Sequence, residues 1–193
     1  RSDPVLEFDA NGNFYYNSLT HDIQSNFICD VYRIEDGGVE WDEGTYAHGG
    51  DKQWMQIDRT GGEGDGHVYA FWTSYYSICY PGFFTRSTDE GDTYDDCVEI
   101  NGNPYWGTIA VGPDGEVYTV GTTNNISAVV TKSTTAQNPD TTITWDAISY
   151  VDLDGSLTGW TNINPAGLLG QAWIDVDKSD GPGRGYVYVP VSY

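Results

Sequence analysis

Apolar and polar positions alternate in short runs along this chain, and glycine-rich corners separate the runs. One arrangement recurs four times: an apolar run, a corner with glycine, and a second run that carries a tyrosine. The paired runs span 5–9 and 12–15, 54–58 and 66–69, 108–112 and 115–118, and 173–177 and 185–188. Alternation over such lengths predicts half-buried β-strands, with the glycines in the turns between them.

The tyrosines of the second runs give the spacing of this repeat. They are Tyr15, Tyr69, Tyr118 and Tyr188, and the first three are separated by 54 and then 49 residues. A period of roughly 40–50 residues built from short strands is typical of β-sheets arranged radially. We therefore predict an all-β protein, a β-propeller of four-stranded antiparallel blades, with the four tyrosines at equivalent positions.

The strand count predicts one domain, a partial propeller over 1–193. Its blades are expected at approximately 3–47, 48–100 and 101–150, followed by a half-blade at 151–193. A propeller has about four to eight blades, and a half-blade leaves an unpaired edge. We expect about three and a half blades of a six- or seven-bladed propeller, completed by the same gene or by another chain.

A turn motif follows the tyrosine run of the second copy. The pattern Ser-x-Asp-x-Gly-x-Thr-aromatic is matched at every position by Ser87, Asp89, Gly91, Thr93 and Tyr94, and weaker copies stand at 34–41 and 133–145. On these residues the chain resembles the sialidase-like β-propellers with Asp-box (bacterial neuraminidase) repeats, over essentially its whole length. A short Asp side chain accepts hydrogen bonds from turn N–H groups and glycine takes the positive φ, so the box is predicted to be structural. The resemblance places it opposite the active site.

Charge and composition limit the partners. The net charge is −21, which argues against nucleic acid because that interaction depends on Lys and Arg at the phosphates. No apolar run approaches the roughly 18 residues of a membrane span. The chain does not open on a signal peptide, and we expect any such segment to lie upstream. An extracellular or cell-surface protein is predicted.

Three cysteines allow one internal pair. Cys79 precedes the third strand of the second blade, and Cys97 is expected on its outer strand. Because these strands are antiparallel neighbours, the pair can reach the Cα separation of about 5.5–6 Å that a disulfide needs. The alternative is three buried thiols. Cys29 is predicted to be free or paired with a missing part.

The candidate site lies, by the same resemblance, on the side opposite the boxes. Aromatic rings with neighbouring polar groups suit a sugar, because its C–H face stacks while its hydroxyls need partners. The candidate ligand-binding residues are His48, Asp51, Tyr105, Trp106 and Trp160. Trp54 and Trp173 head inner strands and are expected mainly to fill space between blades. No cofactor is evident, and 152–155 resembles part of a calcium loop without its further ligands.

Two functions stay open. The resemblance implies a propeller that acts on or binds carbohydrate, either as a sialidase-like glycoside hydrolase or as a hydrolase or lyase of another specificity that uses carboxylates such as Asp22 or Asp51 with His48. A sialidase of this kind needs three arginines around the substrate carboxylate, but Arg33 and Arg86 precede box turns, and Arg59 and Arg184 fall in corners. The triad is not found in this segment, and the catalytic residues are unknown. The alternative is a non-catalytic adhesion propeller that binds glycans or proteins.

Overall fold

The protein is all-β, as predicted. The computed structural model describes residues 3–35, 37–123, 127–152, 154, 157 and 171–191. Thirteen strands in this part of the chain form four antiparallel sheets. The one helix among the described residues is the 3₁₀ turn η1 (Ser74–Tyr76), and no described helix is long and apolar enough to span a bilayer.

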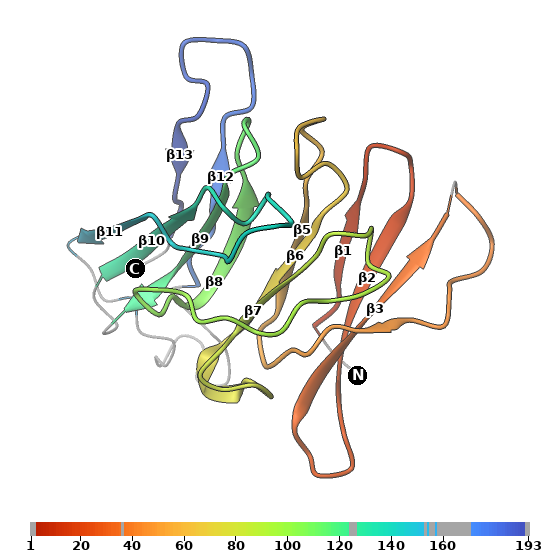
Figure 1. Ribbon diagram of the computed structural model, residues 1–193. Coiled ribbons are helices and arrows are strands. Elements are labelled where there is room, and N and C mark those ends of the chain that lie inside the picture. The colour runs from red at the N-terminus through yellow and green to blue at the C-terminus, as the bar shows by residue number, and fades with distance from the viewer. Residues whose placement is uncertain are drawn as a thin grey trace.

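The first and third sheets each contain four strands, ordered as they follow one another along the chain (Figure 1). The first sheet consists of β1 (Val5–Phe8), β2 (Phe14–His21), β3 (Phe27–Ile34) and β4 (Thr45–Tyr46). The third consists of β8 (Tyr105–Val111), β9 (Val117–Thr123), β10 (Ser127–Ser133) and β11 (Ala147–Asp152). Alternating burial along β2 and β3 follows the alternation of the sequence.

The second sheet has three strands, so the fourth strand predicted here is wrong. It consists of β5 (Trp54–Ile57), β6 (Val68–Phe71) and β7 (Phe84–Ser87). The chain that follows makes only one isolated bridge, between Phe84 and Val98. This segment still runs beside β7, since Asp95 donates its N–H to the Arg86 carbonyl at 2.8 Å and Val98 exchanges backbone hydrogen bonds with Phe84, and a disulfide joins Cys97 to Cys79, before β7. The fourth described sheet contains β12 (Asp175–Val176) and β13 (Val187–Tyr188).

The prediction of equivalent tyrosines is confirmed by the strand register. Each tyrosine lies opposite the third residue of the preceding apolar run; the pairs are Glu7 with Tyr15, Gln56 with Tyr69, Ala110 with Tyr118, and Asp175 with Tyr188. Each corner is also closed by the same backbone hydrogen bond, which the N–H of the last residue of the apolar run donates across the turn. The four sheets are therefore copies of one structural unit.

At the third corner a carboxylate also accepts a backbone N–H of the turn, but a different residue supplies it. In the other copies an aspartate ends the run and its carboxylate accepts the N–H two residues on, as Asp9 does from Asn11 at 2.9 Å. The third copy has Gly112 at this place. Glu116 enters from the other side of the turn, accepting from the Asp114 N–H at 3.0 Å and from the Tyr118 hydroxyl at 3.1 Å. A Cβ at position 112 would lie 2.7 Å from the Glu116 carboxyl carbon, so the glutamate carboxylate fills the place of the missing aspartate.

Successive sheets meet along their first strands. β1 packs beside β5, β5 beside β8, and β8 beside β12, so these four strands line one concave side (Figure 1). A separate apolar core fills each junction between neighbouring sheets. Tyr15, Tyr69 and Tyr118 each contribute to one of these cores, which explains why the repeat keeps a large residue there.

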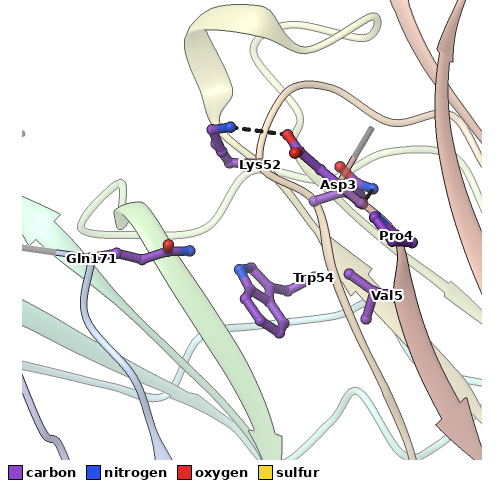
Figure 2. Close-up of a pocket in the computed structure, with 7 residues that line it drawn as sticks. Asp3, Pro4, Val5, Lys52, Trp54 and Gln171 are labelled. Carbon is purple, nitrogen blue, oxygen red and sulfur yellow. Dashed lines mark hydrogen bonds and ion pairs between the residues drawn. The ribbon is translucent and has the colours of Figure 1, made fainter. Parts of the chain in front are cut away.

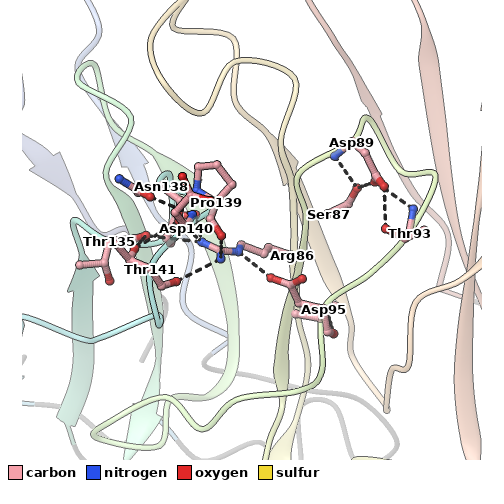
Figure 3. Close-up of polar contacts among 12 residues, drawn as sticks. Arg86, Ser87, Asp89, Thr93, Asp95, Thr135, Asn138, Pro139, Asp140 and Thr141 are labelled. Atoms are coloured by element: carbon pink, nitrogen blue, oxygen red, sulfur yellow. Dashed lines mark hydrogen bonds and ion pairs between the residues drawn. The ribbon is translucent and has the colours of Figure 1, made fainter.

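A basic residue on the third strand lies opposite each of these tyrosines, namely Arg33, Arg86 and Lys132. The two arginines reach forward to the next sheet. Arg33 donates to the backbone O of Glu90 at 2.8 Å. Arg86 is buried and donates to the carbonyls of Ala136 at 2.9 Å and Asn138 at 2.7 Å (Figure 3). These arginines thus join neighbouring sheets.

Candidate functional site

The 87–94 turn is a compact hydrogen-bonded unit (Figure 3). The buried Ser87 hydroxyl donates to Asp89 Oδ1 at 2.7 Å and accepts the Gly91 N–H at 2.8 Å. Asp89 accepts the Thr93 N–H at 2.9 Å and its hydroxyl at 2.6 Å. Burial raises the pKa of Asp89, but these hydrogen bonds outweigh it and hold the pKa below its ordinary value. Tyr94 packs on the core between the first two sheets. All these contacts serve the turn itself.

Because successive strands are antiparallel, their connections alternate between two opposite ends of the sheets. The corner end carries the four glycine corners and the 87–94 turn. The loop end carries the 21–27 turn and the connections 47–53, 72–82 and 101–106. The predicted ligand-binding residues within the described part of the chain all belong to the loop end.

Backbone strain is concentrated at the loop end. Among the described residues, seven of the eight non-glycine residues with left-handed φ lie there: Asp3, Ser25, His48, Lys52, Asn103, Trp106 and Asp154. The eighth is Glu90 in the 87–94 turn. Bulky side chains such as Trp106, at φ 51°, adopt this conformation only when their surroundings enforce it, and such residues cluster at functional sites.

A pocket of about 360 Å³ opens where the loop end meets the concave side (Figure 2). It is lined by Asp3, Pro4, Val5, Lys52, Gln53, Trp54 and Gln171. Lys52 Nζ forms an ion pair with Asp3 Oδ2 at 2.9 Å. Figure 2 shows the Trp54 indole between Gln171 and Val5. The pocket therefore combines an aromatic ring with amide groups and one neutralised charge pair.

One polar atom of this pocket is unused. Gln53 is 2% exposed, and its Nε2 donates to the backbone O of Asp3 at 2.5 Å. Its Oε1 is buried and accepts no hydrogen bond from the described residues. A buried acceptor without a donor costs about 1–3 kcal/mol, and because this oxygen has no exposed surface, a ligand in the pocket would reach it only after the side chain moved.

A second cavity, of about 540 Å³, continues along the concave side. Its lining includes Trp54 and Trp173, whose rings meet edge to face with centroids 4.5 Å apart. Trp54 is half-buried and packs on two junction cores, which fits the space-filling role expected for it. Trp173 is 48% exposed, so this role does not account for it. The two indoles come from sheets that are separated by β8.

The predicted residues fall into two groups. Tyr105 and Trp106 are half-buried, with ring centroids 4.6 Å apart. Burial raises the pKa of Tyr105, and the charges of Tyr76 and Asp51 raise it further. His48 instead lies against Tyr46, at 5.1 Å between centroids. Trp160 lies outside the described residues.

Cys79 and Cys97 form a disulfide with a Cα separation of 6.3 Å. A ring nitrogen of His48 lies within 4.8 Å of both sulfurs. While the sulfurs are bonded to each other they are not thiolates, so the imidazole is the one strong metal ligand of this trio. Cys29 is free and buried, and burial raises the pKa of its thiol to about 12.

The described arginines all lie away from the loop end. Arg33 and Arg86 join sheets, Arg59 stacks on the Phe8 ring at 4.0 Å, and Arg184 pairs with Asp114 at 2.9 Å. None of the four lines the pocket of Figure 2. Lys52 is the pocket's single cation among the described residues.

Sequence reasoning missed Asp3, Gln53 and Gln171. All three are polar residues directly before or near the apolar run that opens a sheet. The start of each innermost strand meets the loop end at the concave side, so a polar residue just before such a run is the signal that could have identified them.

Comparisons with known proteins give a fold likeness alone. No protein-family model matches the sequence, and no curated protein matches it either. A solved structure, a protein of unknown function from Dyadobacter fermentans, is similar with a TM-score of 0.58 at 16% sequence identity. The match covers 94% of this chain and 50% of that one, so the chain spans about half the length of this structural relative.

Proposed function

We propose that this chain is a segment of a secreted β-propeller of the sialidase-like type, and that its loop end binds neutral carbohydrate. The repeated tyrosine register and the adjacent first strands support the propeller, since blades of a propeller pack around an axis in this manner. The remaining blades come from the same gene or from another chain.

The observation that carries the binding proposal is the pocket of Figure 2 together with the adjoining cavity lined by Trp173, since Trp54 lines both. A sugar presents a C–H face that stacks on an indole and hydroxyls that need paired polar groups. Trp54 and Trp173 supply indoles on the concave side. The Gln171 side chain lines the same pocket and supplies an amide for the sugar hydroxyls.

Charge favours a neutral ligand over an anionic one. The Lys52 ammonium is already paired with Asp3, and the described arginines are engaged elsewhere. Asp51 adds negative charge beside the pocket, and the protein as a whole carries −21. A sialoside in the pocket of Figure 2 would therefore meet an unfavourable field, and the cations of the adjoining cavity, Arg59 and Lys178, lie there beside the carboxylates of Glu7 and Asp175.

Binding is favoured over hydrolysis for this segment. Glycoside hydrolysis needs two carboxyl groups roughly 5–9 Å apart across the scissile bond. The pocket of Figure 2 contains one carboxylate among its lining residues, that of Asp3, and Lys52 neutralises it. The adjoining cavity is lined by Glu7, which pairs with Arg59 at 3.4 Å, and by Asp175, and no scissile bond is placed between them. We therefore assign no catalytic residue to this segment.

A glycan array followed by calorimetry tests the proposal. Trp173→Ala should weaken binding of a neutral glycan by about 1–3 kcal/mol, or about 5- to 150-fold, because a stacking surface is lost. Trp41→Ala is the matched control, since this tryptophan is similarly exposed, at 44%, but follows β3 at the corner end. Absence of neutral-glycan binding, or equal losses in both variants, would reject the proposed site. Turnover of a fluorogenic sialoside would contradict the charge argument.

A further inference from the structure

Aromatic side chains from three sheets gather at the loop end outside the pocket. Ring centroids are 5.9 Å apart for His21 and Phe27, 5.6 Å for Phe27 and Tyr76, and 4.8 Å for Tyr76 and Tyr75. This series begins in the β2–β3 turn of the first sheet and ends on η1 after the second sheet's β6. Tyr105 and Trp106 form a further pair at the start of β8. We call these six residues the aromatic rim.

Two of the rim's rings are prominently exposed. The exposed fractions are 74% for Tyr75 and 43% for Tyr76. Large aromatic rings that are open to solvent beside a pocket mark interaction surfaces more often than chance exposure does. A tyrosine also keeps a polar hydroxyl at its tip, so it suits a partner that is apolar on one face and hydroxylated at its edge.

The backbone under η1 is held in place. Thr73 donates its N–H to the backbone O of Asp51 at 2.9 Å, and Ile78 donates to that of Gly49 at 3.0 Å. The Cys79–Cys97 disulfide fixes the chain directly after this segment. A binding surface that is already ordered loses less conformational entropy when a ligand associates, so the rim is prepared for contact.

The rim adjoins the pocket through one connection. Asp51 is followed by the pocket residues Lys52 and Gln53, and its backbone O accepts the N–H of Thr73, directly before η1, at 2.9 Å. Its carboxylate is the charge shared by both regions. An anionic polymer crossing from pocket to rim would be repelled there, whereas a neutral one would not.

From these observations we propose that the aromatic rim extends the pocket into a longer groove for a neutral polysaccharide chain, with successive sugar rings stacking on Tyr75, Tyr76 and Tyr105. This inference rests on the proposed carbohydrate binding and specifies its ligand as a polymer. A pocket that acted alone would be satisfied by one or two sugar residues.

The test compares ligand length by calorimetry. The probes are cellohexaose, xylohexaose and mannohexaose, each beside its monosaccharide, with hexagalacturonate as the anionic counterpart. The wild-type protein should bind at least one neutral hexasaccharide about tenfold or more tightly than its monosaccharide. Hexagalacturonate should bind more weakly than the neutral hexasaccharides.

Variants separate the rim from the pocket. Tyr75→Ala combined with Tyr76→Ala should remove most of the gain in affinity of the hexasaccharide over the monosaccharide. The affinity for the monosaccharide should stay unchanged. Tyr75→Phe keeps the ring and should keep most of the gain. Tyr186→Ala is the control, because this tyrosine is 62% exposed but belongs to the corner end. Circular dichroism verifies that each variant is folded.

The outcomes distinguish the two proposals. Equal binding of monosaccharide and hexasaccharide by the wild type would overturn the rim proposal while leaving the pocket proposal intact, and would point to a protein partner for the rim. An unchanged gain in the double variant would also overturn it. Absence of binding to every sugar would reject the carbohydrate function itself.

Discussion

Replacing Arg86 by alanine should be among the most damaging single changes in this protein. Its side chain is 5% exposed, and Nε pairs with Asp95 Oδ2 at 2.7 Å. The other two nitrogens donate to carbonyls of residues 135–141, in the connection between β10 and β11 of the next sheet, at 2.7 to 3.5 Å. Alanine would remove every one of these contacts and leave their acceptors in the junction between the sheets.

The expected loss of stability in Arg86→Ala follows from how deeply the Arg86–Asp95 ion pair is buried. Breaking a buried ion pair by removing one partner costs about 3–5 kcal/mol. Asp95 is 49% exposed and water can solvate it, so the lower part of this range applies and we expect about 3 kcal/mol. Arg33 is the matched comparison: its carboxylate partners, Glu35 and Asp92, are 72% and 66% exposed. Arg33→Ala should therefore cost only about 1 kcal/mol.

Urea unfolding followed by tryptophan fluorescence measures both values. With a total stability of about 5–15 kcal/mol, a 3 kcal/mol loss shifts the midpoint clearly without abolishing the folded state. Arg86→Lys keeps the charge but offers one compact donor group, so it should recover less than half of the loss. If Arg86→Ala costs no more than Arg33→Ala, the buried guanidinium does not stabilise the junction and the reasoning is wrong.

Three further predictions concern the same region. Replacing both Cys79 and Cys97 by serine should cost about 3 kcal/mol because the closed loop of 18 residues is released in the unfolded chain, and an unchanged melting temperature would contradict this. Ser87→Ala should cost about 1–2 kcal/mol and Asp89→Ala about 0.5–1, since Ser87 is buried whereas Asp89 is exposed; urea midpoints that rank them in reverse would refute the assignment. The lowered pKa of Asp89 means that its contribution is complete above the unfolded value of about 3.9 and is lost as pH falls below it. Asp89→Asn should therefore flatten the stability curve between about pH 5 and 3, as a pH series of thermal melts would record.

Local patterns in the sequence were sufficient for most of the strand arrangement. The tyrosine register could be predicted because alternation decides which face of a strand is buried and a glycine corner fixes how two strands align. The hydrogen bonds of Ser87, Asp89 and Thr93 follow from turn chemistry within seven residues. The Cys79–Cys97 pair was foreseeable because both cysteines flank one hairpin.

Contacts between sheets were not predictable in the same way. The acceptors of Arg86 lie about 50 residues further along the chain, in an insertion whose conformation no local pattern specifies. Trp54 and Trp173 meet across a strand that belongs to neither of their sheets. The fourth strand predicted for the second sheet is only partly formed, because the segment after Asp95 pairs with β7 at a single bridge, between Phe84 and Val98. Gln53 became a candidate only once its burial and its unused oxygen were known.

The Gly112 and Glu116 exchange at the third corner has a consequence for anyone recombining these repeats. Positions 112 and 116 together supply one carboxylate to the turn, from Glu116, and the glycine at 112 leaves the space that this carboxylate occupies. The residue that suits either position therefore depends on the residue at the other. A chimera that received aspartate at 112 from another copy would crowd two acids into one turn, whereas one that lost Glu116 alone would have none. Exchanges between repeats must therefore transfer whole corners. Counting identical residues at aligned positions underestimates the structural similarity of the repeats.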